Sequence, residues 1–123
     1  DQEALREAVA RLYGKESHAE RVRELEPEGF DPALWSAVVR MGLPVMALGE
    51  RHGGAGGSLT DLAAAVEVHG SHMGLVPLVE TAVAARLLAR LGEPAADLLA
   101  RIVGGAPAAL RLRLSGDGPV PTL

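Results

Sequence analysis

Apolar residues recur every three or four positions along most of this chain, which is the spacing of amphipathic helices. The first apolar face is formed by Leu5, Val9 and Leu12, in a helix that we expect to end at Gly14. Further segments with helical spacing or helix boundaries are 17–27, 31–42, 58–70, 77–92 and 94–104. The pattern predicts an all-α fold, an orthogonal or up-down helical bundle of about five to six helices.

Polar residues at the start of several segments support these boundaries. Ser17 with Glu20, and Ser58 with Asp61, each match a capping box, in which two side chains accept hydrogen bonds from backbone N–H groups. Asp31 is followed by a proline, and an N-cap residue before a proline at the first helical position is a common helix start. We therefore predict that helices begin at these three places.

The spacing of apolar residues changes near the end of the chain. Leu110, Leu112 and Leu114 alternate with two arginines, and a period of two predicts a half-buried strand. A single strand cannot satisfy its backbone hydrogen bonds, so we expect a sheet in a longer polypeptide or pairing with another chain. We divide the chain into a helical domain, residues 1–105, and the start of a β-domain or a truncated tail, residues 106–123.

Composition adds limits on function and location. Hydrophobic residues make up 48% of the chain and aromatic residues only 2%, so we expect a core of Leu, Val and Ala in closely packed helices. The net charge is −4 and the chain has no basic block, which argues against a nucleic-acid partner. The chain has no cysteine and no apolar run of membrane-spanning length. We expect no membrane insertion and a cytoplasmic location in a bacterium. The basic residues of the chain are almost all arginine, which indicates a GC-rich genome.

A dense glycine loop precedes the segment that begins at Ser58. It contains Gly53, Gly54, Gly56 and Gly57, and such a loop could cradle a phosphate or form a tight corner between two helices. A Walker loop would place a lysine before Ser58, and the dinucleotide-binding pattern would place a third glycine where the chain has a leucine. These two departures favour the helix-to-helix corner.

Other candidate chemistry is weaker. His69 and His72, with Glu67 nearby, could hold a metal ion, but no second cluster supplies further ligands, so polar residues at a helix end are favoured. No serine lies in a nucleophile motif. We therefore assign no catalytic residue and no metal ligand to this chain.

The order of these features resembles the N-terminal helical domain of the acyl-CoA dehydrogenase family over roughly residues 2–114. The turn L-G-E-R-H-G-G-A-G-G-S resembles that family's Pro-Glu-x-x-Gly-Gly-x-Gly turn, with Gly49 in place of the proline. F-D-P-A-L-W-S-A-V-V-R-M-G-L resembles the tryptophan-bearing helix before it. The family's next helix and its lead into the β-domain resemble the segments 77–92 and 101–110.

The resemblance implies a part of a flavoprotein that dehydrogenates the α,β bond of an acyl-CoA thioester. In that family FAD lies between the β-domain and a C-terminal helical bundle, and a glutamate of that bundle removes the α-proton. The flavin contacts and the base are therefore expected outside this chain. Val76, Pro77, Leu78 and Thr81 could be plain core or line an apolar cavity, and the resemblance favours part of the acyl-pocket wall. It also implies a homo- or hetero-oligomer.

One departure keeps an alternative open. The family's flavin-contacting stretch Thr-Glu-Pro…Gly-Ser-Asp should follow the first strand, whereas residues 115–121 read S-G-D-G-P-V-P. Either that stretch lies further along a longer polypeptide or this member has lost it. The second case would make the chain a catalytically silent helical partner subunit, or an interaction module, of a mixed oligomer.

Overall fold

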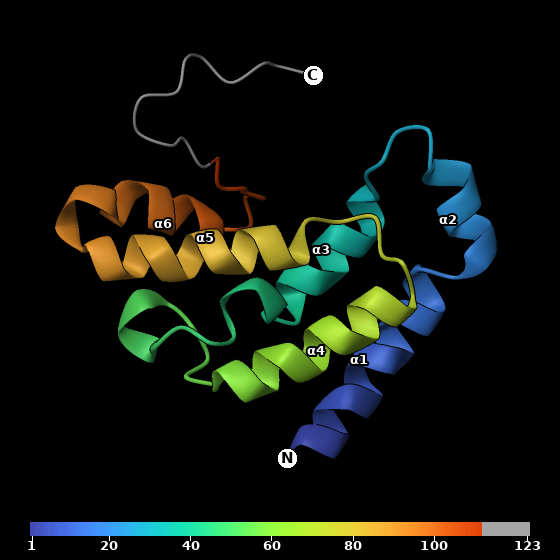
Figure 1. The fold of residues 1–123 in the computed structure, drawn as a ribbon, viewed down its shortest axis with the longest axis horizontal. Helices are drawn as coiled ribbons and strands as arrows, with labels where there is room; N and C mark the ends of the chain where they lie inside the picture. The colour runs from blue at the N-terminus through green and yellow to red at the C-terminus, as the bar shows by residue number, and fades with distance from the viewer. Residues whose placement is uncertain (112–123) are drawn as a thin grey trace.

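The computed structural model describes residues 1–111, and its regular elements are all helical (Figure 1). The α-helices are α1 (Gln2–Glu16), α2 (Ala19–Leu25), α3 (Pro32–Arg40), α4 (Leu59–Ser71), α5 (Leu78–Leu91) and α6 (Ala96–Val103). Short 3-10 helices are η1 (Leu43–Val45), η2 (Glu50–His52) and η3 (Glu93–Ala95). Helix α1 packs against α4, and α5 packs against α6 (Figure 1). Over the described residues, the predicted all-α class is confirmed.

Two of the three predicted helix starts are confirmed by their hydrogen bonds. Ser58 Oγ accepts from the Asp61 N–H at 3.1 Å, and the Asp61 carboxylate accepts from the Ser58 N–H at 3.0 Å, which completes the capping box. Asp31 Oδ1 accepts from the Leu34 N–H at 3.1 Å at the start of α3. Each bond satisfies a backbone donor that the first helical turn leaves without a partner.

The predicted capping box at Ser17 is wrong, as are two predicted helix ends. Ser17 is buried and ends α1, and the N-cap of α2 is His18, whose Nδ1 accepts from the Arg21 N–H at 3.3 Å. Helix α1 continues past Gly14, and α4 continues past Gly70. Glycine allows a helix to end without requiring it, and the packing of the surrounding turns extends both helices.

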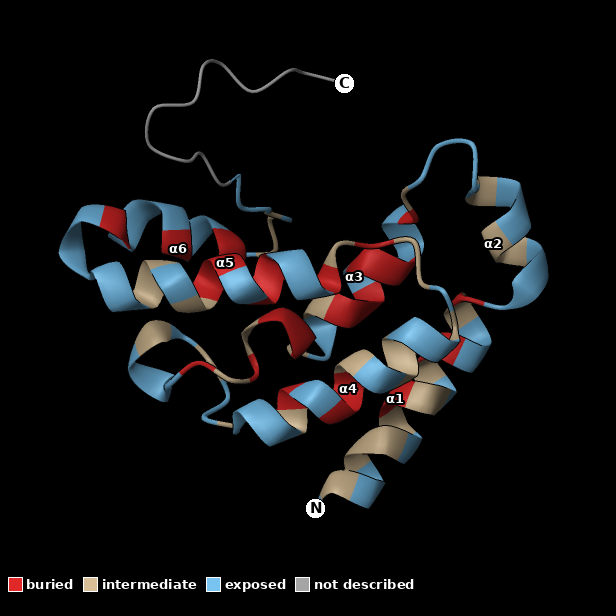
Figure 2. Cartoon of the chain, in the orientation of Figure 1, coloured by how far each residue is buried: buried red, intermediate tan, exposed pale blue. Residues whose placement is uncertain are grey.

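The core has two parts, and α5 contributes to both. The larger cluster joins α1, α3, α4, η1 and the start of α5 around residues such as Val38, Leu43 and Leu78. The smaller cluster joins α5, α6 and the segment before η2. Figure 2 shows buried residues along α3 and α5, whereas α2 has none. The core is built mainly from Leu, Val and Ala, as the composition predicted.

The chain after α6 has no regular structure as far as Arg111. Trp35 Nε1 donates to the Gly105 carbonyl at 2.8 Å, which fixes this exit segment to α3. The predicted strand at 110–114 lies mostly outside the described residues, so the strand and the division at residue 105 stay predictions. None of the helices from α1 to α6 is both long and apolar enough to cross a membrane.

Candidate functional site

The four residues predicted to line an apolar pocket lie together at the start of α5, but they face mainly inward. Leu78 and Thr81 are fully buried, and Val76 is also buried. Pro77 is partly exposed. Val76 and Leu78 belong to the larger core cluster. In the described chain by itself, this segment is therefore packed against its own domain rather than open to a ligand.

The hydroxyl of Thr81 both donates and accepts a hydrogen bond inside the domain. It donates to the Ala108 carbonyl at 3.1 Å and accepts from the Ala108 N–H at 3.0 Å. This pair of bonds resembles one rung of a backbone ladder, and it attaches the exit segment to α5. Thr81 thus positions the chain where it leaves the helical domain.

The same helix carries an exposed apolar surface on the side away from the buried residues Leu78 and Thr81. Val79, Val83, Leu87 and Leu91 are between 39% and 58% exposed. Their four-residue spacing places them along one side of α5, and we call them the outer face of α5. A row of exposed apolar side chains on one helix is a common sign of a contact surface. The signal was present in the sequence as a second apolar stripe.

The described part of the chain has several surface cavities. One, of about 360 Å³, lies between α5, α6 and the exit segment. Another, of about 480 Å³, lies between α2 and the end of α4. The first is lined by Ala84, Leu88, Leu98, Arg101, Ile102 and residues 106–110. Its lining is predominantly apolar, so it could accept a hydrocarbon group or an apolar side chain.

The glycine loop is a helix-to-helix corner, as predicted. Gly56 N–H donates to the Leu48 carbonyl at 2.8 Å, and Gly57 N–H donates to the Met46 carbonyl at 2.7 Å. Gly53 and Gly56 have φ angles of +88° and +73°, which favour glycine. These N–H groups are therefore engaged within the corner and do not point at a phosphate.

The glycine loop offers no free backbone donor to a flavin. The backbone N–H groups of the glycine loop donate to carbonyls of the same corner. In residues 1–111, no buried side-chain nitrogen or oxygen lacks a hydrogen-bond partner. A flavin site would need donors that are free to meet the pyrophosphate and the ring. We accordingly assign no flavin contact to this part of the chain.

The histidine cluster joins α1 to α4. His69 Nδ1 lies 2.8 Å from the Tyr13 hydroxyl oxygen. The two rings pack edge to face, with their centroids 5.6 Å apart. Glu67 pairs with Arg6 at 3.1 Å, so it too serves the same helix contact. Among the described residues, no three His, Cys, Asp or Glu side chains are grouped closely enough to hold a metal ion.

Burial shifts the proton equilibria of this pair. It raises the pKa of the Tyr13 hydroxyl above its ordinary value of 10.0, because the phenolate would lose its hydration. It lowers the pKa of His69 below 6.5, and the negative charge of Glu80 opposes that shift. Both shifts favour the neutral forms, a phenol beside an uncharged imidazole.

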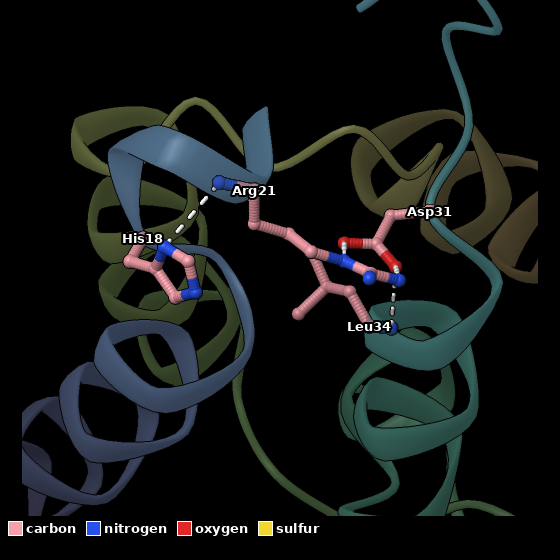
Figure 3. Close-up of polar contacts among 4 residues, drawn as sticks. All are labelled: His18, Arg21, Asp31 and Leu34. Carbon is pink, nitrogen blue, oxygen red and sulfur yellow. Dashed lines mark hydrogen bonds and ion pairs between the residues drawn. The ribbon is translucent and has the colours of Figure 1, made fainter. Parts of the chain in front are cut away.

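Helix α2 is tied to the start of α3 by a buried carboxylate (Figure 3). Arg21 Nη2 donates to Asp31 Oδ1 at 3.1 Å, and Arg21 Nε donates to Asp31 Oδ2 at 3.4 Å. Asp31 also caps α3 through the Leu34 N–H. The hydrogen bonds from Arg21 to this carboxylate raise the pKa of the guanidinium further.

Comparison with known proteins gives a consistent result. The family model described as "Acyl-CoA dehydrogenase, N-terminal domain" matches residues 1–105. The acyl-CoA dehydrogenase IpdE2 of Mycolicibacterium smegmatis is 38% identical over 103 residues, which cover 80% of this chain and 33% of that protein. IpdE2 of Mycobacterium tuberculosis is 32% identical over 108 residues, covering 85% and 34%. The chain thus spans about a third of the length of these curated relatives. No solved structure gives a significant match.

Proposed function

Because this chain belongs to the acyl-CoA dehydrogenase family and is its N-terminal domain, we propose that it forms part of the wall of an acyl pocket and packs against the other domains of the enzyme. The observation that carries the proposal is the exposed outer face of α5. Apolar side chains left open to water on a family domain are suited to contact a hydrocarbon group or a neighbouring domain.

The wall is proposed at the start of α5, in the segment that contains Val76, Pro77, Leu78 and Thr81. Leu78 and Thr81 are buried, so they would support the wall from behind. Val79, which lies beside them on the exposed side, would contact the acyl group directly. Because Val79 is 39% exposed, covering its remaining surface would contribute less than the roughly 1.5 to 3 kcal/mol of a fully buried side chain.

The whole enzyme is proposed to dehydrogenate the α,β bond of an acyl-CoA thioester, within fatty acid metabolism of the bacterial cytoplasm. FAD would take the hydride there, held by parts of the protein beyond the described residues, and the catalytic base would also come from elsewhere. The protein would act as an oligomer. The contribution of this domain is then shape and positioning, which decide which acyl groups reach the reacting atoms.

Substitution of Val79 by Trp in the complete enzyme tests the wall. We expect Val79→Trp to lower kcat/KM for long or bulky acyl-CoA substrates at least about tenfold more than for short ones, because the ring fills the pocket. Leu91→Trp is the matched control, since Leu91 lies on the same face about 18 Å away along the helix. An unchanged chain-length preference in stably folded Val79→Trp would remove this residue from the pocket.

The redox activity has a separate test. The purified complete protein should show flavin absorbance, either as isolated or after FAD is added. A protein that stays colourless under both conditions would refute the dehydrogenase proposal for this chain alone. It would favour the silent partner subunit, whose sequence motivation lies outside the described residues.

A further inference from the structure

The linker between α4 and α5, residues 72–77, presses against the buried Tyr13–His69 pair. A Cβ atom built on Gly74 would lie 2.7 Å from Tyr13 Cε2 and 3.0 Å from His69 Nδ1. The preceding residue, Met73, has a φ angle of +49° although it is not glycine, and its side chain is exposed. The backbone is therefore held in an unfavourable conformation by what it packs against.

The same linker is bonded to two other parts of the domain. The Ser17 hydroxyl donates to the His72 carbonyl at 3.4 Å, at the end of α1. The Asp31 N–H donates to the Leu75 carbonyl at 2.8 Å, next to α3. A movement at Gly74 would thus reach α1, α3 and the first turn of α5 together.

Protonation of His69 changes the chemistry of the pair. Among the described residues, His69 Nδ1 is the one hydrogen-bond partner of the Tyr13 hydroxyl. We therefore assign the neutral tautomer that satisfies the buried O–H group, with the ring proton on Nε2 and Nδ1 as the acceptor. A proton on Nδ1 turns this acceptor into a donor, so the bond must reverse and the phenol proton loses its acceptor. Tyr13 is fully buried, so water does not replace that acceptor.

The groups that face His69 only partly offset this cost. Glu80 approaches from α5 and favours the charged imidazolium, whereas burial disfavours it more strongly. His72 packs against Tyr13 with ring centroids 5.8 Å apart, and its own Nδ1 lies 3.0 Å from the Val68 carbonyl. From α1, the facing titratable group is Tyr13 itself, which remains a neutral phenol.

We propose that the Tyr13–His69 hydrogen bond is a proton-sensitive latch, which holds the α4–α5 linker while His69 is neutral and releases it when His69 is protonated. Because the folded pKa of His69 is lowered, the stabilisation is present above pH 6.5 and is lost as the pH falls through the lowered value. An effect on acyl binding would rest on the proposed function, since the linker leads into the proposed wall. The latch itself does not depend on that function.

Amide hydrogen exchange of residues 72–75 in the full chain tests the latch. After correction for intrinsic exchange, protection should fall severalfold between about pH 7.5 and a pH below the midpoint of the His69 ring titration by NMR, because the folded pKa of His69 lies below the ordinary value. His69→Asn keeps an acceptor oxygen near the position of Nδ1 but cannot titrate, so its protection should stay high at both pH values. His52→Asn is the matched control and should respond to pH like the wild type, because His52 contacts Arg51 on η2.

Two results would overturn the latch. One is a wild-type loss of protection at low pH in His69→Asn, and the other is wild-type protection at neutral pH in folded Tyr13→Phe. If Tyr13→Phe does not fold, the midpoint of the His69 ring titration by NMR in the wild type must coincide with the midpoint of linker exchange, and a mismatch refutes the proposal. Neither readout involves acyl-CoA or flavin, so failure here leaves the proposed function standing.

Discussion

At Gly54 the chain approaches its own backbone too closely for any side chain to fit. A Cβ atom there would lie 2.6 Å from the Val45 carbonyl oxygen and closer still to that of Leu48. We expect Gly54→Ala to lower the free energy of unfolding by about 3 kcal/mol, since rigid backbone must move. Gly49→Ala in the same loop has open space and an ordinary φ of −64°, so it should change stability by less than about 0.5 kcal/mol. Denaturant unfolding of both variants measures the difference, and equal stabilities would contradict this account of the corner.

The sequence could predict the role of a residue where that role depends on residues close to it along the chain. Asp31 and Ser58 act on backbone groups three residues away, so their capping roles follow from nearby sequence. Ser17 matched the same pattern, but its hydroxyl is drawn to the carbonyl of His72 across the domain. The Tyr13–His69 bond joins residues 56 positions apart, and no spacing rule indicates such a contact. Residue roles set by tertiary packing were therefore the ones missed.

Among the elements, α2 depends most on a single interaction. It has no buried residue, and Arg21 ties it to the Asp31 carboxylate (Figure 3). We expect Arg21→Met to remove most of the hydrogen-exchange protection of α2 while α3 stays protected, because Asp31 still caps α3. Asp31→Ala should weaken both helices, and Arg23→Met, on the same helix, should weaken neither. Protection of α2 that survives Arg21→Met would show that the helix is held by other contacts.

In helix α5, the spacing of apolar residues does not decide which side of the helix faces the core. Leu78 and Thr81, two of the predicted pocket residues, lie on the inward side of α5 and are buried. The helix also carries apolar residues on its opposite side, so apolar spacing alone does not say which side meets the core of this domain. The pocket prediction followed from the family resemblance and not from exposure. The structure separates the two sides by exposure.

At the scale of the whole molecule, the family explains why a domain leaves such a surface open. The chain spans about a third of its curated relatives, and the order of its helices and glycine corner along the sequence is sufficient to indicate the family. The proposed partners of the outer face would lie outside the described residues, so neither sequence pattern nor packing within residues 1–111 identifies them. Inter-domain packing is the part of the proposed function that a stability measurement can test directly.

Leu87, near the middle of the outer face of α5, provides that test. In the 123-residue chain, Leu87→Asp should change the free energy of unfolding by less than about 0.5 kcal/mol, because the side chain is already 43% exposed. In the complete polypeptide the same change should cost about 3 kcal/mol, since a carboxylate would be buried without a partner. Leu88→Asp, on the inward side against the smaller core cluster, should destabilise both forms. Thermal unfolding of the two forms compares them, and an equally small effect of Leu87→Asp in both would mean that no domain covers this face.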